Sequence, residues 1–326
     1  MLISKTPLRV SLFGGGTDFP EYFEAYGGGV IGGAINKYIY ITLLRLSPTA
    51  DQKYRIQYRT IENVNKVDEI THPLIRASLI KLNLDDRLNI ATVADLPGGT
   101  GLGSSSSFTI GLLSVLNEYF SLEMKLEQKV DLSIEIERKI LNEHGGIQDQ
   151  MHASYGGFRH YEFGLGDIKS EVLLNETNLR KLSSSSILVS TGATRSAARI
   201  SKEIEHKIKD KLDTLHEMNK ITLQAKKYFS VSDLEQNFVK IGKLLTQSWE
   251  LKRNITSRIS NQHVDAIYSR GMQMGAYGGK LLGAGENGFV YFLMPNNIKS
   301  RFQNEFGANN CVEFDFTNVG SEVYKI

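Results

Sequence analysis

A run of glycines and hydroxyl-bearing residues in the first third of the chain has the composition of a phosphate-binding loop. It reads Pro97-Gly98-Gly99-Thr100-Gly101-Leu102-Gly103-Ser104-Ser105-Ser106-Ser107. Glycines let a backbone turn tightly and approach a ligand closely, and the apolar pattern that follows predicts a helix over 105–120. The N–H groups and positive end of that helix suit a phosphate. A serine hydroxyl there could ligate an accompanying magnesium ion.

A flexible Gly/Ser linker is the alternative interpretation of this run. A linker, however, needs neither the apolar strand predicted over 88–94 nor the apolar helix that follows. The run also departs from two common nucleotide-binding patterns. Gly98 and Gly103 have the Walker spacing, but Ser104 stands where that loop requires lysine. The alternating glycines do not have the Gly-x-Gly-x-x-Gly spacing of dinucleotide-binding folds.

A second glycine-rich block follows the first predicted strand. Apolar residues alternate with Arg9 and Ser11 over 8–13, which predicts a strand with two distinct faces. Three glycines, Thr17 and Asp18 come next. A carboxylate on such a loop can accept hydrogen bonds from sugar hydroxyls, whereas a helix N-cap is the alternative role for Thr17 or Asp18. The glycines of 27–35 either lie against a ligand or only allow close packing.

Glu137 lies on the apolar stripe of a helix predicted over 127–141, together with Val130, Ile134 and Leu141. A buried carboxylate without a cationic partner is costly. A magnesium ion would supply that partner, and Arg138 on the bordering face is the alternative. Glu135 is a second candidate for the metal.

Three further segments carry candidate groups. Asp149 follows Gly145-Gly146 on a loop that enters a new helix, where it could also be a simple cap. Thr191–Ser196 follows a strand predicted over 187–190 and opens a helix, so Arg195 there would suit a second anion, as would Lys5 at lower priority. A third glycine-rich block, 280–289, precedes a strand over 290–293.

The four blocks at 7–18, 97–107, 145–150 and 280–289 resemble, in order, the motifs of the GHMP kinases. This family is named for galactokinase, homoserine kinase, mevalonate kinase and phosphomevalonate kinase. The defining pattern Pro-x-x-x-Gly-Leu-Gly-Ser-Ser is matched in full by 97–105. The resemblance implies an α+β fold with the active site in a cleft between two domains, and transfer of the γ-phosphoryl of ATP to a hydroxyl of a small molecule.

The resemblance also implies roles for individual residues. Asp149 would be catalytic and would accept or orient the attacking hydroxyl proton, with Arg9 as its basic partner. Ser105 and Glu137 would hold Mg²⁺, since Glu137 lies twelve residues before Asp149. Residues 97–107 would bind ATP. The residues expected at the substrate are Gly15, Gly16, Thr17, Asp18, Gly33, Gln150, Arg195 and Gly285.

Departures from the family pattern bear on the substrate. The Glu-His pair of galactokinases is missing before Thr17, which argues against galactose. The triple glycine resembles the branch of heptose phosphate and fucose kinases. We therefore expect phosphorylation of the anomeric hydroxyl of D-glycero-D-manno-heptose 7-phosphate, for nucleotide-activated heptose and surface polysaccharide. The alternatives are an L-fucose or other hexose 1-kinase and a silent sugar- and ATP-binding regulator.

The third block departs as well. Asn287 replaces a glycine, and asparagine tolerates positive φ. Glu286 adds a carboxylate that would repel phosphate unless it points outward.

Chain length, charge and composition limit the possible domain organisation, partners and location of the protein. The 326 residues predict two domains, which we place at 1–170 and 171–326. The 38 basic and 36 acidic residues nearly balance, so neither nucleic acid nor a membrane is expected as a partner. The lone Cys311 and the absence of a long apolar run predict a cytoplasmic protein. We expect a monomer or homodimer.

Long helices are predicted over 199–229 and 234–252 from their apolar spacing.

Overall fold

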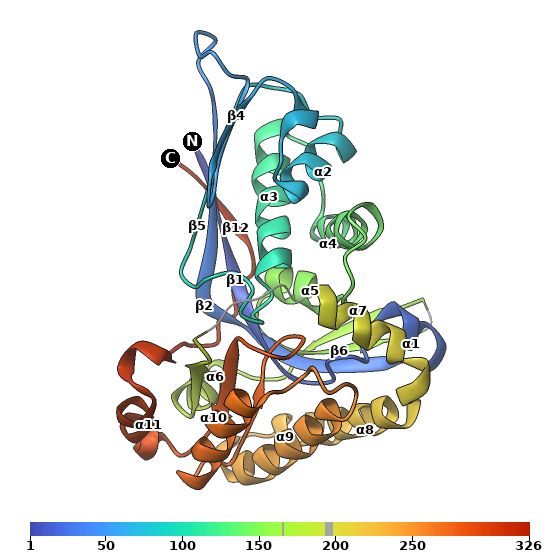
Figure 1. The fold of residues 1–326 in the computed structure, drawn as a ribbon, viewed down its shortest axis with the longest axis vertical. Helices are drawn as coiled ribbons and strands as arrows, with labels where there is room; N and C mark the ends of the chain where they lie inside the picture. Colours follow the sequence, from blue (N-terminus) through green and yellow to red (C-terminus); the bar gives the residue numbers. More distant parts are fainter. Residues whose placement is uncertain (165, 193–197) are drawn as a thin grey trace.

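The computed structural model of the chain describes residues 1–164, 166–192 and 198–326, and it combines two separate β-sheets with helices (Figure 1). The strands are β1 Leu2–Phe13, β2 Gly28–Arg45, β3 Tyr54–Gln57, β4 Ile61–Val64, β5 Leu88–Ala94, β6 Phe158–Phe163, β7 Ile168–Val172, β8 Ser186–Ser190, β9 Gly278–Leu281, β10 Phe289–Leu293, β11 Cys311–Val312 and β12 Glu322–Lys325. The helices are α1 Pro20–Tyr26, α2 Pro73–Lys81, α3 Ser104–Phe120, α4 Leu126–Ile134, α5 Gln148–Tyr155, α6 Glu176–Ser184, α7 Ala198–Lys207, α8 Leu212–Phe229, α9 Phe238–Arg253, α10 Gln262–Gln273 and α11 Lys299–Phe306.

The larger sheet has the order β12-β1-β2-β5-β3-β4 and is extended by β6 and β7. The long strand β2 pairs with β1 along one edge, while its other edge pairs first with β6 and then with β5. The alternation predicted over 8–13 is present in β1, where every residue from Thr6 to Phe13 is buried. One face of β1 packs into the core, and the other carries Arg9 and Ser11 into a cavity.

Helices α2, α3 and α4 cover one face of this sheet (Figure 1). Helix α3 packs against β1 and β2, and its residues from Ser106 to Leu116 are all buried. A close approach explains the glycine in its middle, because a Cβ on Gly111 would lie 2.7 Å from Thr6 Oγ1. The N-terminus of α3 is thereby held beside the middle of β1.

The smaller sheet is antiparallel, with the order β11-β8-β10-β9. Helices α9 and α10 pack against β9, and α8 bridges α9 to β2 of the larger sheet. The strand predicted over 187–190 is β8, and the block after residue 289 forms the buried strand β10.

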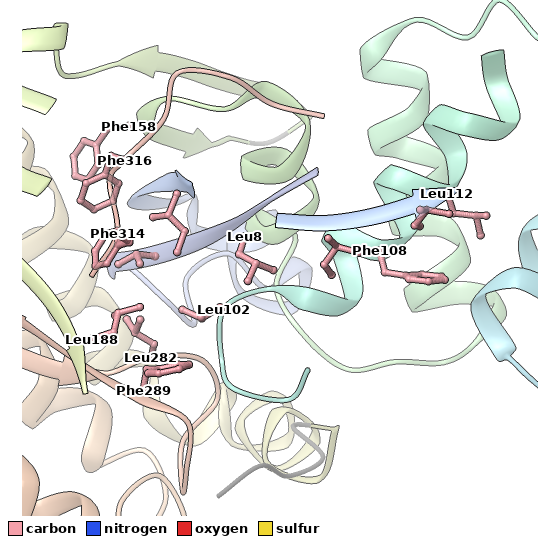
Figure 2. Close-up of a cluster of buried hydrophobic side chains, with 14 of the residues drawn as sticks. Leu8, Leu102, Phe108, Leu112, Phe158, Leu188, Leu282, Phe289, Phe314 and Phe316 are labelled. Atoms are coloured by element: carbon pink, nitrogen blue, oxygen red, sulfur yellow. The ribbon is translucent and has the colours of Figure 1, made fainter. Parts of the chain in front are cut away.

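One hydrophobic cluster joins the two sheets (Figure 2). Its members include Leu8 of the larger sheet, Leu188 of the smaller sheet and Leu102 of the glycine-rich loop. Because Leu102 is fully buried in this cluster, its side chain anchors the loop between the two sheets. The remaining side chains labelled in Figure 2 are Phe108, Leu112, Phe158, Leu282, Phe289, Phe314 and Phe316.

Several predicted helix and strand boundaries were wrong. The helix predicted over 127–141 is α4 followed by a π-helical segment, Glu135–Ile140. It ends at Ile140, before Gly145-Gly146, and Asn142 just beyond it has φ of 55°. The helix predicted over 199–229 is broken at the 3₁₀ turn Lys209–Lys211. The β-branched and aromatic residues of 38–46 predict a strand. Strand β2 covers most of this range but begins ten residues earlier, at Gly28, so most of the glycine-rich block of 27–35 lies in the strand.

The α+β fold class is confirmed, whereas the division at residue 170 stays a prediction. Two observations bear on that division. Strand β7 continues the larger sheet to Val172, and β12 returns from the end of the chain to pair with β1. The two ends of the chain consequently lie side by side (Figure 1), and the terminal amine donates to the carbonyl of Ile326 at 2.9 Å.

Candidate active site

A cavity of about 660 Å³ brings together groups from distant parts of the chain. Its lining comes from strands β1 and β9, helices α3, α5, α7 and α9, the π-helical segment, and several loops, among them the loop before α1, the glycine-rich loop and the loop after β9. The first, second and third glycine-rich blocks therefore converge on one space with Asp149, as the cleft expected from the sequence requires.

The glycine-rich loop divides into residues that line this cavity and residues that hold the loop in place. Residues 98, 99, 101 and 103–106 line the cavity. Gly99, Gly101 and Gly103 have φ between 74° and 82°, which side chains other than glycine rarely adopt. The other predicted members point elsewhere: Thr100 donates to Pro97 O at 2.9 Å, Ser107 donates to Pro7 O at 2.8 Å, and Leu102 is in the core.

Arg9 and Asp149 form a bidentate ion pair at the centre of the lining. The Nε and Nη2 atoms of Arg9 lie 2.7 and 2.8 Å from the two carboxylate oxygens of Asp149. The third nitrogen of Arg9 donates to Gly101 O at 2.6 Å, so the pair is tied to the glycine-rich loop. A Cβ on Gly103 would lie 3.2 Å from Asp149 Oδ2, which places this carboxylate directly against the N-terminus of α3.

Glu137 is buried in the cavity wall. Its carboxylate accepts hydrogen bonds from Ser106 and Gln150 at 2.8 Å and from Ser133 at 3.2 Å. None of these three donors is a cation, and burial raises the pKa of the Glu137 carboxyl to about 7. This residue therefore meets the condition that the sequence indicated, a buried carboxylate surrounded by neutral groups.

Two sequence-based alternatives for Glu137 are excluded. Arg138 is directed away from it, to Glu21 at 2.6 Å and to Glu205 at 3.6 Å. Glu135, the second metal candidate, pairs with Lys81 at 2.7 Å and does not line the cavity.

Two serines at the start of α3 are near the predicted magnesium site, and the assignment of Ser105 to the ion stays a prediction. Ser105 lines the cavity, but the hydroxyl bonded to Glu137 belongs to Ser106. Among the described residues, no group of three His, Cys, Asp or Glu side chains could hold a metal ion. Carboxylate and hydroxyl oxygens completed by substrate phosphates are, however, a donor set that suits Mg²⁺. The residues at this place fit that ion.

Asp18 and Gln148 form a second buried polar pair in the lining. Asp18 accepts hydrogen bonds from the backbone N–H of Gly16 at 2.9 Å and from Gln148 Nε2 at 2.8 Å. Burial raises the pKa of the Asp18 carboxyl, and the negative charge of Asp149 acts in the same direction. Gly15 and Gly16 line the cavity beside Asp18, and so does Gln150.

Three predicted substrate residues of the described chain do not reach the cavity lining. The hydroxyl of Thr17 lies 2.9 Å from Gly14 O and 3.0 Å from Gly29 O, so it holds the turn instead. Gly33 sits in β2 against the rings of Phe158 and Phe316. Gly285 packs against the backbone of Ile259.

The structure describes only one of the two side chains predicted to bind an anion. Arg195 lies outside the described residues. Lys5 rests over the ring of Tyr38, with its Nζ 4.2 Å from the ring centroid, and is absent from the cavity lining.

The third glycine-rich block, 280–289, meets the glycine-rich run 97–107 through the backbone. A Cβ on Gly283 would lie 2.4 Å from Gly101 Cα. The expectation about Asn287 was wrong, because the non-glycine residue with positive φ in this block is Glu286, at 68°. The N–H of Glu286 donates to Ile259 O at 2.7 Å, and Asn261 Nδ2 donates to the carbonyl of Glu286, so two backbone contacts hold this turn.

Several lining residues were missed from the sequence, namely Ser11, Gln148, Lys252 and Lys280. Ser11 could have been found, because it shares the polar face of β1 with Arg9. Gln148 directly precedes Asp149, and Lys280 begins the third block. No comparable sequence feature marked Lys252 as a lining residue.

Comparison with known proteins decides the family. Residues 68–157 match the N-terminal domain of GHMP kinases. The whole chain is also 30% identical to D-glycero-alpha-D-manno-heptose 7-phosphate kinase of Campylobacter jejuni subsp. jejuni serotype O:2, over 99% of this chain and 98% of that protein. This chain belongs to the GHMP kinase family.

One further relative and one solved structure are also similar to this chain. The GHMP kinase described here is 29% identical to the galactokinase of Pyrococcus furiosus, over 90% of this chain and 89% of that one. Its fold superposes on the D-glycero-D-manno-heptose 1-phosphate kinase from Bacteriodes thetaiotaomicron with a TM-score of 0.81 at 24% identity, covering 100% of this chain and 99% of that structure.

This GHMP kinase is accordingly a phosphotransferase that acts on an alcohol group of a small molecule, and its family uses ATP as the phosphate donor. In the part of the chain that the structure describes, no helix combines the length and the apolar composition needed to span a membrane.

Proposed function

We propose that this GHMP kinase transfers the γ-phosphoryl group of ATP to the anomeric hydroxyl of D-glycero-D-manno-heptose 7-phosphate. The observation that carries the proposal is the position of the Arg9–Asp149 pair between the glycine-rich loop and the buried Asp18–Gln148 pair. The Campylobacter jejuni relative, which matches along nearly its whole length, supports this acceptor.

The reaction is a balanced exchange of bonds at the γ-phosphorus. The anomeric oxygen forms a bond to phosphorus while the bond from phosphorus to the β–γ bridging oxygen breaks, and ADP leaves with that electron pair. Asp149 accepts the proton of the attacking hydroxyl or orients it. Arg9 holds the Asp149 carboxylate in a fixed orientation through two charge-assisted hydrogen bonds, which are the stronger kind.

The donor side is formed by the glycine-rich loop and the start of α3. Backbone N–H groups and the positive helix end there are suited to bind the triphosphate. We place Mg²⁺ at Glu137 together with a hydroxyl of Ser105 or Ser106. When bound, that ion neutralises charge on the β- and γ-phosphate oxygens.

The acceptor side is rich in buried polar atoms that lack a partner among the described residues. Ser11 Oγ, Gln148 Oε1 and Gln150 Oε1 are buried and unpaired, and all three residues line the cavity. Leaving such atoms unpaired costs about 1–3 kcal/mol each, so a ligand with many hydroxyl groups would offset that cost. A sugar is such a ligand. The assignment of Arg195 to the sugar phosphate stays a prediction.

Phosphorus NMR tests the proposal directly. The purified protein is incubated with Mg-ATP and D-glycero-D-manno-heptose 7-phosphate. We expect a new anomeric phosphate signal while the 7-phosphate signal is retained. ATP consumption without that signal would contradict the proposed transfer. Turnover of L-fucose or another hexose instead would identify a hexose 1-kinase, and no turnover with any sugar would favour a silent regulator.

A further inference from the structure

Strand β7 forms an exposed edge of the larger sheet. Within the described part of the chain it pairs with β6 alone, and all five of its residues are exposed. Its two apolar side chains, Ile168 and Val172, have exposed fractions of 41% and 50%. An edge strand presents unpaired N–H and C=O groups, which are a template for pairing with another chain.

The pairing of β7 with β6 decides which of its backbone groups point outward. At one end of this ladder, Gly164 N–H donates to Asp167 O at 2.7 Å, and a second bond at the other end has the same phase. Opposed residues of an antiparallel pair alternate between hydrogen-bonded and non-hydrogen-bonded positions. The odd-numbered residues of β7 therefore bond to β6, whereas the N–H and C=O groups of Ile168, Ser170 and Val172 point away from it.

The sequence of β7 is self-complementary in this phase. Two copies that pair antiparallel around Ser170 place Ile168 opposite Val172 of the second copy, so apolar side chains meet and all outward backbone groups find partners. The same register places Lys169 opposite Glu171 of the second copy, so the charges match as well. Each of these contacts occurs twice, because the pairing is two-fold symmetric.

The other two edge strands of the larger sheet in the described chain, β12 and β4, lack this match. In β12 the N–H of Ile326 bonds back to β1, so Val323 and Lys325 carry the outward groups. Since outward residues must pair with outward residues, no symmetric antiparallel register places Glu322 opposite Lys325 of a second copy. Strand β4 carries Glu62 but no cationic residue.

We propose that this protein forms a two-fold symmetric homodimer in which the β7 strands of two copies pair antiparallel around Ser170. The dimer joins the two larger sheets into one continuous sheet. Helix α8 flanks the seam, because its Lys226 forms an ion pair with Glu171 at 2.7 Å. Leu223, one turn before Lys226 and 46% exposed, adds apolar surface on the same side of α8.

The proposed dimer is independent of the proposed kinase function. The structure describes every residue of β7, and none of them lines the active-site cavity. The oligomeric state can therefore be measured without a substrate, and its outcome leaves the assignment of the acceptor sugar unaffected.

Sedimentation velocity over a concentration series measures the association. The wild type should pass from a monomer to a species of twice the 36.5 kDa chain mass. Ser170→Pro removes an outward N–H group that β6 does not use, and proline is tolerated at such edge positions. We expect the dissociation constant of the dimer to rise at least about tenfold in this variant, because the central hydrogen bonds of the seam are lost.

Charge variants test the register. Lys169→Glu and Glu171→Lys each place like charges opposite one another, so each protein alone should associate at least about tenfold more weakly than the wild type. An equimolar mixture of the two should recover the affinity, because every charge at the seam then meets its opposite. Glu322→Lys, on the edge strand β12, is the matched control and should dimerise like the wild type.

The outcomes separate this seam from other surfaces. If Ser170→Pro does not fold, as judged by circular dichroism, the two charge variants and their mixture carry the test. A wild type that stays monomeric at every concentration would overturn the proposal, and so would a mixture that associates no better than its components. A dimer that persists unchanged in the β7 variants, or that Glu322→Lys disrupts instead, would also overturn it, because another surface would then hold the two copies together.

Discussion

At the scale of single residues, the chemistry depends on how a few charged groups are paired. Asp149 is held by Arg9, and Asp18 is held by Gln148 and a backbone N–H, so the two carboxylates on the acceptor side have different surroundings. Only Asp149 lies against the N-terminus of α3. That position is the physical basis for assigning it, rather than Asp18, to the hydroxyl proton.

Asp149→Asn should retain nucleotide binding but lower kcat by at least about 10²-fold, because an amide cannot accept the hydroxyl proton. Steady-state kinetics and calorimetry with AMP-PNP measure the two quantities. Asp167→Asn, at an exposed position outside the cavity, is the control. Near-normal turnover in Asp149→Asn would remove this residue from its proposed role.

His152 links a buried side chain to the pH dependence of stability. Its ring is fully buried, neither ring nitrogen has a partner in the described part of the chain, and it lies edge-on to Tyr161 with centroids 4.9 Å apart. Burial, with repulsion from Arg9 and Arg159, lowers the pKa of His152 to about 3. The folded protein thus favours the neutral ring, whereas the unfolded chain takes up a proton below the usual pKa of about 6.5.

The stability contributed by neutral His152 is therefore fully present above pH 6.5 and is lost as the pH falls toward 3. From pH 7 to pH 5, this one group should lower the free energy of unfolding by roughly 2 kcal/mol. Urea unfolding at the two pH values should show a smaller loss in His152→Gln than in the wild type. His206→Gln, at an exposed position, should keep the wild-type loss. An unchanged loss in His152→Gln would contradict this account.

At the scale of elements, the active site depends on loops that approach one another more closely than side chains permit. The π-helical segment carries Glu137 to the start of α3, where Ser106 meets it. The glycine-rich run 97–107 and the third glycine-rich block, 280–289, touch at Gly101 and Gly283. These contacts join an N-terminal loop to a C-terminal loop, so the donor side of the cavity is built from both.

Gly101→Ala should destabilise this junction. Its φ is +82°, and a Cβ there would lie 2.5 Å from Leu282 O, so both the backbone conformation and the contact would be strained. We expect a loss of about 2 kcal/mol or more in the free energy of unfolding. Gly98→Ala is the comparison, because its nearest neighbour, Ser104 Oγ, is 3.7 Å away. Equal free energies of unfolding for Gly101→Ala and Gly98→Ala in chemical denaturation would contradict this expectation.

At the scale of the whole molecule, the two halves share one core and one cavity. Leu102 and Leu282 belong to the same cluster (Figure 2), and β12 completes the larger sheet beside β1. Glu205 of α7 also contacts Arg138 and His144 of the first half. The proposed boundary at residue 170 thus separates parts that depend on each other.

A fragment of residues 1–170 should not fold cooperatively on its own. It would lack β12 and would expose the part of the core that packs against the smaller sheet. Thermal unfolding followed by circular dichroism should show no sharp transition, and calorimetry should show no AMP-PNP binding, in contrast to the full chain. A sharp transition with nucleotide binding would establish 1–170 as an independent domain.

The sequence by itself determined the family, the α+β fold class and nearly half of the residues around the cavity. Glycine-rich loops, a helix start and a carboxylate on an apolar stripe are local patterns, because turn geometry and helical periodicity depend on neighbouring residues. Glu137 and the glycines of 97–107 could be identified in this way, whereas Asp149 was singled out by its resemblance to a family motif.

Only the tertiary structure decided which neighbours meet. Successive residues of a helix point about 100° apart, so the orientation of α3 decides which serine faces Glu137. That orientation comes from packing, and the sequence alone therefore could not identify Ser106 as the partner of Glu137. Three contacts join residues more than a hundred positions apart: Asp18 with Gln148, Gly101 with Gly283, and Lys280 with Leu12. Such contacts arise from the packing of whole elements around a shared core, which no local pattern encodes.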